Sequence, residues 1–137
     1  MDSKGGTESV MQQRQTYGGN TCRFSDFHKF DVVDSRGENL GSVDDVMFDL
    51  SSGQIHQVFV RAGDFLGLGG KMLAIPFRAL DIRGKRLQLH RTKDELMKAP
   101  WSEQGQMFTP DYDRTSSTYW GEEWGGPYYS EEQTPRA

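Results

Sequence analysis

Residues 29–100 of this chain consist of short stretches in which apolar and polar residues alternate, and each stretch ends at a different turn signal. Alternation with a period of two predicts β-strands that bury one face. Turn signals about every 8–12 residues are typical of a small all-β barrel or sandwich. The expected strands cover residues 29–34, 41–50, 54–62, 71–76 and 86–90.

Two of these strands carry features that predict how the sheet curls and what covers it. In the second strand the alternation breaks at Asp44–Asp45, where one extra residue predicts a β-bulge. A bulge increases the curl of a strand, as a small barrel requires. In the third strand Val58 and Val60 share one face and Phe59 lies on the other. Phe59 is therefore expected at an interface or under a tail of the chain.

Short helical segments are expected at both ends of the strand region. The stretch Thr92-Lys-Asp-Glu95 is a capping box, in which the Thr92 hydroxyl caps the first turn and Glu95 reaches back. Pro100 then ends this helix. Before the first strand, Ser25 is expected to cap a helical turn whose phenylalanines plug one end of the barrel.

The 137 residues are expected to form one domain with two tails. Residues 1–23 are rich in Gly, Gln, Ser and Thr and predict a flexible tail, because so few apolar side chains cannot offset the ordering entropy. Residues 24–102 form the expected domain, and residues 103–137 an irregular tail. Cys22 is the only cysteine, no secretory signal is seen, and no stretch approaches the about 18 apolar residues of a membrane span. These features favour a cytoplasmic protein.

The C-terminal tail concentrates both acidic charge and aromatic residues. Residues 101–137 carry two arginines against seven acidic residues, whereas the whole chain has a net charge of −4. They also hold eight of the 16 aromatic residues, including all three tryptophans. Disordered segments are normally poor in aromatics, and Trp and Tyr are frequent interface anchors. Three interpretations stay open: the tail docks on its own barrel or a sister subunit, it recognises a partner, or it has no function.

Three stretches taken in order resemble a PRC-barrel domain. The first opens with Phe30-Asp-Val-Val-Asp-Ser-Arg-Gly and ends at Gly53, and the second runs from Val60-Arg-Ala-Gly-Asp-Phe-Leu-Gly to Leu80. The third combines Leu87-Gln-Leu with Lys93-Asp-Glu-Leu-Met-Lys-Ala-Pro100. No single motif is diagnostic, but the ordered set is specific, and it covers roughly half of the chain.

The resemblance implies a small six-stranded β-barrel with a short C-terminal helix and irregular tails. The superfamily includes the cytoplasmic domain of the photosynthetic reaction-centre H subunit, the C-terminal domain of a ribosome-maturation factor, and small stand-alone proteins. We see neither the transmembrane helix of the H subunit nor the N-terminal partner domain of the maturation factor, so the stand-alone kind is expected. The family implies a docking or adaptor role without shared catalytic residues.

Several residue groups invite a catalytic or ligand-binding interpretation, and each fits a structural role better. The glycine-rich loop 63–71 lacks the spacing of a phosphate-binding loop, because Phe65 stands where the first glycine is required and Met72 replaces Ser/Thr. Asp44, Asp45 and Asp49 alternate with apolar residues as on a solvated strand face. The three histidines lack ligand spacing, and Cys22 has no basic activator except Arg23. No catalytic, metal or cofactor residue is predicted.

The candidate residues are therefore candidates for interaction. A basic group around residues 83–93 is expected to be a solvated face, to hold the acidic tail, or to contact RNA. The leading hypothesis is a non-enzymatic adaptor, homodimeric, that binds an unknown protein; the alternative is an accessory factor in RNA processing or ribosome assembly. The candidate interaction residues are Phe59, Phe65, Leu66, Arg83, Lys85, Arg86, Tyr119, Trp120, Trp124, Tyr128 and Tyr129.

Overall fold

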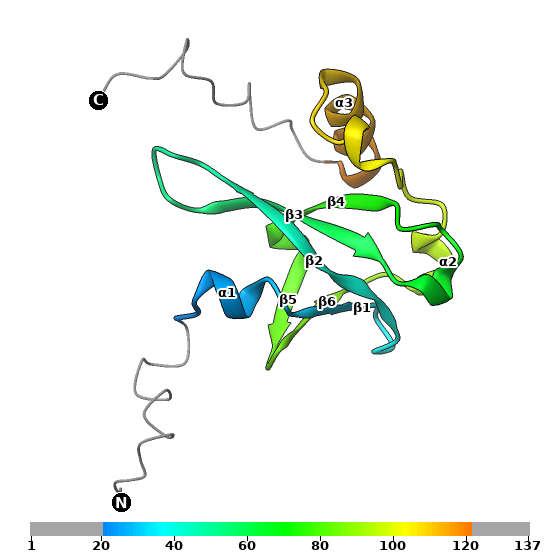
Figure 1. Ribbon diagram of the computed structural model, residues 1–137, viewed down its shortest axis with the longest axis horizontal. Coiled ribbons are helices and arrows are strands. Elements are labelled where there is room, and N and C mark those ends of the chain that lie inside the picture. Colours follow the sequence, from blue (N-terminus) through cyan, green and yellow to red (C-terminus); the bar gives the residue numbers. More distant parts are fainter. Residues whose placement is uncertain (1–20, 122–137) are drawn as a thin grey trace, which may run out of the picture.

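Six strands of this chain form one curled sheet in the computed structural model, which describes residues 21–121 (Figure 1). Across the sheet the strands follow in the order β4-β3-β2-β1-β6-β5. Neighbouring strands are antiparallel except β1 and β6, which run parallel. The strands are β1 (Asp31–Val33), β2 (Asn39–Phe48), β3 (Ile55–Ala62), β4 (Met72–Pro76), β5 (Leu80–Arg83) and β6 (Arg86–Leu89).

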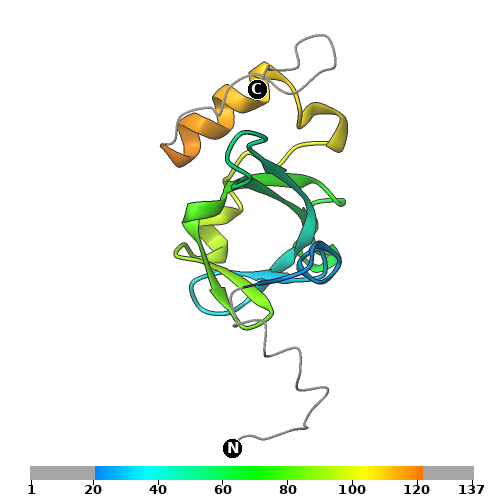
Figure 2. The ribbon, with the colours of Figure 1, turned by 90° about the vertical axis from the view of Figure 1, so that its left-hand side faces the viewer.

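The sheet curls strongly around its core, as the end-on view in Figure 2 shows. The register of β2 against β3 shifts between Val43 and Asp45, which confirms the predicted bulge. The ladder ends at β4 on one side and at β5 on the other, and within residues 21–121 no ladder joins these two strands. The structure therefore confirms a curled six-stranded sheet but not the closure of a full barrel. Only the 3₁₀ turn η3 (Phe77–Ala79) separates β4 from β5.

Two short elements differ from the sequence-based expectation. The strand pattern did not predict β5, because the four residues Leu80–Arg83 between two turns contain too few repeats to stand out. The helical turn before β1 is present as α1 (Phe24–Phe27), but its N-cap is Arg23 and no side chain caps it. The expected capping role of Ser25 is wrong, because the turn begins two residues earlier than that cap requires and Ser25 lies inside it.

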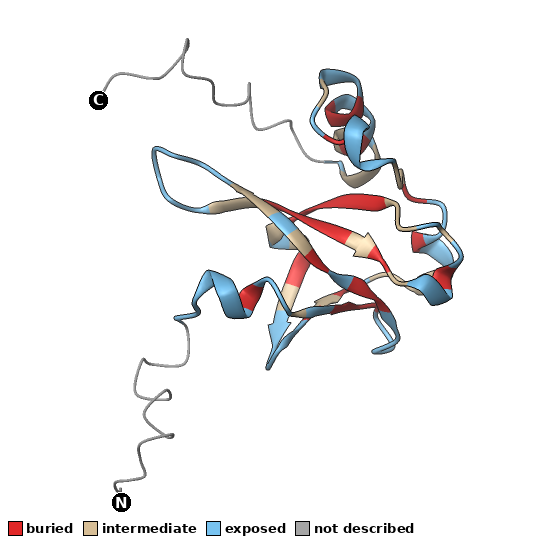
Figure 3. Cartoon of the chain, in the orientation of Figure 1, coloured by how far each residue is buried: buried red, intermediate tan, exposed pale blue. Residues whose placement is uncertain are grey.

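The inside of the curl is filled by apolar side chains from every strand, and Figure 3 shows how burial concentrates along the sheet. At one end α1 contributes Phe27, which fills this end of the core as predicted, while Phe24 stays exposed. The helix α2 (Lys93–Leu96) contributes Leu96 and carries the predicted capping box with Thr92. The buried cluster consists of Phe27, Val32, Leu40, Val43, Val58, Val60, Leu73, Ile75, Leu80, Leu87, Leu89, Leu96 and Ala99.

A buried carboxylate joins the β1–β2 turn to α2. Asp34 Oδ1 accepts hydrogen bonds from the backbone N–H groups of Arg36 (2.9 Å) and Glu38 (2.8 Å). Its Oδ2 accepts one from the N–H of Lys93 (2.8 Å) at the start of α2. Burial alone would raise the pKa of Asp34, but these three N–H groups and the charge of Arg36 outweigh burial and lower it.

The segment after α2 is ordered by a third helix, so the prediction of a wholly irregular C-terminal tail is wrong. This segment contains η4 (Gln104–Gln106) and α3 (Pro110–Trp120). Thr109 caps α3 by accepting the N–H of Tyr112, Pro110 occupies its first turn, and Gly121 ends it in the left-handed conformation. None of the helices within residues 21–121 has the length and apolar character that crossing a membrane requires.

Candidate interaction surfaces

The C-terminal segment covers the outer edge of β4. The N–H and carbonyl of Met72 both pair with Ser102, each at 2.8 Å. Two residues further along the strand, the N–H of Ala74 donates to the Tyr112 hydroxyl (3.1 Å), and its carbonyl accepts the indole N–H of Trp120 (2.8 Å). An exposed strand edge invites pairing with another chain, so these bonds protect β4 from edge-to-edge association.

The same segment covers the outer face of the sheet at Phe59. Phe59 is buried in a second apolar cluster with Met72, Ala74, Met107 and Tyr112. The ring of Phe108 packs against it at a centroid distance of 5.0 Å. Of the two positions expected for Phe59, the structure therefore shows the one under the tail. Burial is the main cause that raises the pKa of Tyr112 to about 12, and the nearby charge of Asp113 adds to it. The hydrogen bond from the N–H of Ala74 acts in the opposite direction and lowers this pKa.

Two further candidate residues, Tyr119 and Trp120, lie against the sheet at the end of α3. The guanidinium of Arg91 lies 5.0 Å from the ring centre of Tyr119 and 4.8 Å from that of Trp120, which is cation–π geometry. The Tyr119 hydroxyl donates to the carbonyl of Glu95 (3.4 Å). Within the described chain, the tail thus docks on its own sheet. Trp124, Tyr128 and Tyr129 lie outside the described residues, as do residues 1–20 of the expected N-terminal tail.

The glycine-rich loop places its two apolar candidates differently. It contains the 3₁₀ turn η2 (Asp64–Leu66), and Gly67 ends this turn with a φ of 70°. Phe65 is 61% exposed, and its ring lies over Gly63, where an added Cβ would fall 2.2 Å from the ring. Leu66 is buried, so it does not contribute to a contact surface. Gly67, Gly69 and Gly70 of this loop all have positive φ, a conformation that glycine adopts without steric cost.

The predicted basic group is divided between two environments. Arg83, Lys85 and Arg86 are exposed on the β5–β6 hairpin, where Arg83 lies 3.7 Å from Asp81. Arg91 instead engages the aromatic residues of α3. Lys93 forms an ion pair with Glu38 at 3.6 Å. The residue that receives the tail is therefore Arg91, and the hairpin keeps its positive charge on the surface.

Two acidic residues of the β2–β3 hairpin, Asp44 and Asp49, bind neighbouring groups of the chain and so have structural roles. Asp44 pairs with Arg61 at 3.2 Å, and Arg61 also donates to the carbonyl of Gly70 and to the side chain of Gln104. Asp49 Oδ1 accepts the N–H of Ser51 at 2.7 Å. Within residues 21–121, no group of three or more His, Cys, Asp or Glu side chains is arranged to hold a metal ion.

Sequence reasoning missed one group of surface residues. Phe48 and Leu50 continue the apolar alternation of Val46, a pattern that is typical of the buried face of a strand. The β2–β3 hairpin extends beyond the curl, however, and both side chains are more than half exposed, as is Ile82 on β5. The alternation itself carried no sign of this exposure, because it does not tell how far a hairpin projects past the core.

These features define a class of protein: a small domain with a curled β-sheet, a capped sheet edge and exposed apolar side chains on tight turns. The chain belongs to the PRC-barrel domain family, since the model of that family matches residues 20–96, more than half of the chain. Membership indicates a protein-interaction module in general terms. The C-terminal cover of β4 lies beyond the matched residues. Comparison with curated proteins finds no match for this chain.

Proposed function

We propose that this protein is a non-enzymatic adaptor that works as a homodimer and binds a protein partner in the cytoplasm. The observation that carries the proposal is the presentation of Phe65. This aromatic side chain is largely exposed, and its position is fixed by a short 3₁₀ turn and by contact with Gly63. An exposed aromatic residue on a rigid loop is typical of a recognition surface, because little conformational entropy is lost on binding.

A crosslinking experiment tests the partner. A photo-crosslinking amino acid is placed at position 65 of the full chain in cells, and at position 98 as the control. Lys98 is also exposed, but it lies two residues after α2 rather than on the glycine-rich loop. We expect a discrete protein crosslinked from position 65 and not from position 98. The proposal fails if neither position captures a protein, or if both capture the same mixture.

A second candidate function rests on the exposed positive charge of the β5–β6 hairpin. Arg83, Lys85 and Arg86 form a small basic surface, and RNA binding in processing or ribosome assembly would use such charge. Recovery of RNA that falls steeply with increasing salt, and that is lost in a Lys85→Glu/Arg86→Glu chain, would favour this candidate over the adaptor.

A further inference from the structure

Three elements lie around one end of the curled sheet, namely α1, the β2–β3 hairpin and the β5–β6 hairpin, and we call this end the α1 face. Asp31, the first residue of β1 after α1, lies beside Arg86 of β6 and Ser42 of β2. The β5–β6 hairpin therefore turns at this end, and β2 continues past it into the β2–β3 hairpin. Figure 1 shows both hairpins and α1 at the same end of the curled sheet, and Figure 2 shows them around its opening, with the two hairpins on opposite sides.

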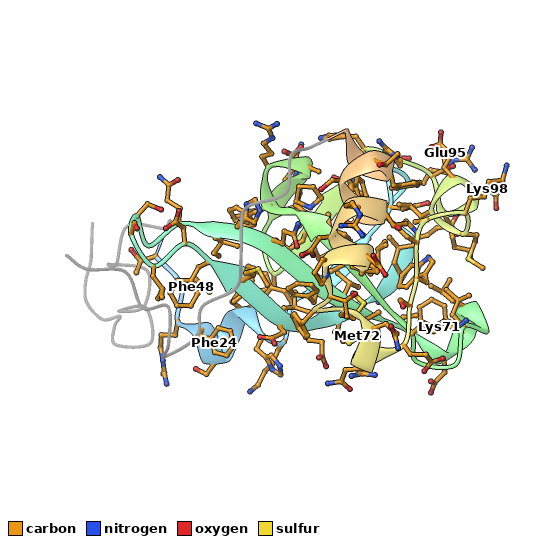
Figure 4. The ribbon with its side chains drawn as sticks, turned by 90° about the horizontal axis from the view of Figure 1, so that it is seen from above. Phe24, Phe48, Lys71, Met72, Glu95 and Lys98 are labelled. Atoms are coloured by element: carbon orange, nitrogen blue, oxygen red, sulfur yellow. The ribbon has the colours of Figure 1, made fainter. Side chains whose placement is uncertain are left out.

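Large apolar side chains gather on the α1 face. Four of the seven large apolar residues that are exposed in the described chain lie there: Phe24, Phe48, Leu50 and Ile82. Figure 4 shows Phe24 and Phe48 at one end of the molecule and Lys71 and Lys98 at the other. Each of the four is more than half exposed. Exposed apolar residues that gather in this way mark an interaction site, whereas single ones need no explanation.

The tip that carries Leu50 is held rigidly. Asp49 donates its N–H to the carbonyl of Gln54 (2.8 Å), and its own carbonyl accepts the N–H of Gly53 (2.7 Å). Its side chain accepts the N–H of Ser51, and Gly53 has a φ of 76°. Leu50 is thus presented by a closed network of hydrogen bonds, so little ordering is needed when it binds.

The charges on the α1 face are separated. The β2–β3 hairpin carries Asp45 and Asp49, both exposed, beside Phe48 and Leu50. The β5–β6 hairpin carries exposed Arg83, Lys85 and Arg86 beside Ile82. Asp81 of β5 pairs with Arg83, so the β5–β6 hairpin keeps a net positive charge rather than a purely basic surface. Each hairpin therefore combines apolar surface with a net charge, and the two net charges have opposite signs.

We infer that the α1 face binds the α1 face of a second copy. A two-fold axis that lies in the plane of contact, between the two hairpins, places the acidic hairpin of each copy on the basic hairpin of the other. Leu50 and Phe48 then meet the Ile82 region of the partner copy twice, as a self-complementary two-fold interface requires. This inference rests on the homodimer in the proposed function and names its surface.

A second copy fits this face better than the chain's own N-terminal segment. Residues 1–20 contain only four large apolar side chains, namely Met1, Val10, Met11 and Tyr17. Their charges cancel, since Asp2 and Glu8 balance Lys4 and Arg14. The second copy offers both the apolar area and the separated charges that the face itself displays.

Charge reversal with rescue tests the inference. Asp45→Lys and Lys85→Glu each place like charges together twice in the dimer, so sedimentation of the full chain should show dimerisation weakened about tenfold or more in each variant. An equimolar mixture of the two variants should dimerise again, because each altered hairpin then meets an altered hairpin of opposite charge. Wild type that stays monomeric at micromolar concentrations, or a mixture without rescue, overturns the inference.

Apolar substitutions provide the matched control. Leu50→Ser with Ile82→Ser should shift the chain toward monomer, whereas Phe65→Ser should leave the dimer intact, because its loop lies at the far end of β3. Circular dichroism verifies that all variants fold. If removal of residues 1–20 turns a monomeric chain into a dimer, the N-terminal segment covers the face and the inference is wrong. Crosslinking at position 65 is independent of these results, so failure of the dimer and failure of partner binding are distinguishable.

Discussion

Asp34 shows how one carboxylate joins parts of the chain that are distant in sequence. Its oxygens bind two N–H groups of its own turn and one N–H at the start of α2. A buried N–H without a partner costs about 1–3 kcal/mol, and hydrogen bonds to a charged group contribute more than neutral ones. The pattern Asp-Ser-Arg-Gly-Glu predicts the local turn, but nothing in the sequence indicates the contact with Lys93.

Replacement of Asp34 should therefore destabilise the fold more than an ordinary surface change. We expect Asp34→Ala to lower the free energy of unfolding by about 2–3 kcal/mol at neutral pH. Asp31→Ala is the control, because Asp31 is exposed, and it should change stability by no more than about 0.5 kcal/mol. Urea unfolding followed by tryptophan fluorescence measures both. Equal values for the two variants would contradict the role assigned to Asp34.

The lowered pKa of Asp34 adds a pH dependence with a defined sign. A depressed folded-state pKa contributes stability that is fully present above the unfolded value of about 3.9 and is lost as pH falls through the folded value. The stability difference between wild type and Asp34→Ala should thus be constant near neutral pH and shrink at acidic pH below about 4. Urea midpoints across this range test it, and a difference that grows on acidification would refute the assignment.

At the scale of elements, α3 protects the sheet edge that β4 exposes. Three residues of the C-terminal segment, Ser102, Tyr112 and Trp120, satisfy four backbone groups of Met72 and Ala74. The same segment covers Phe59 on the adjacent strand. The C-terminal segment, which lies beyond the family match, thus covers the sheet. Its removal should expose both the edge of β4 and the apolar face around Phe59.

Two deletions test this cover. Removing residues 102–137 should leave the β4 edge unpaired and the Phe59 face exposed, so we expect aggregation that increases with protein concentration. Removing residues 122–137 keeps α3 and should leave the chain as soluble as wild type. Static light scattering compares the two. If the chain that lacks residues 102–137 scatters no more light than wild type, the cover is dispensable.

The sequence predicted the elements whose signals are local and missed those that depend on distant contacts. The bulge at Asp44–Asp45 and the capping box at Thr92 follow from adjacent residues, and both are present. The start and stop signals of α3, Thr109-Pro110 and Gly121, are equally local, but its inward face includes Asp113 and Ser116, which hide the apolar periodicity. The exposure of Leu50 and the burial of Leu66 depend on where the core ends, which alternation does not encode.

At the scale of the whole molecule, the two ends of the sheet differ in character. The α1 face combines exposed apolar residues with separated charges, whereas the opposite end presents Phe65 on the glycine-rich loop. A dimer through the α1 face would leave both copies of Phe65 on its outer ends. Under the proposed adaptor role, such a dimer would bind two partner molecules, one at each end.

Dimerisation through the α1 face also predicts how thermal stability depends on concentration. Association stabilises the folded state by mass action, so the Tm of the wild-type chain should rise by several degrees when its concentration is raised about a hundredfold. The Leu50→Ser/Ile82→Ser chain should show a Tm that does not change with concentration. Phe65→Ser should behave as wild type, because its loop lies outside the interface. Differential scanning calorimetry at several concentrations measures all three chains, and a wild-type Tm independent of concentration would exclude a dimer that dissociates on unfolding.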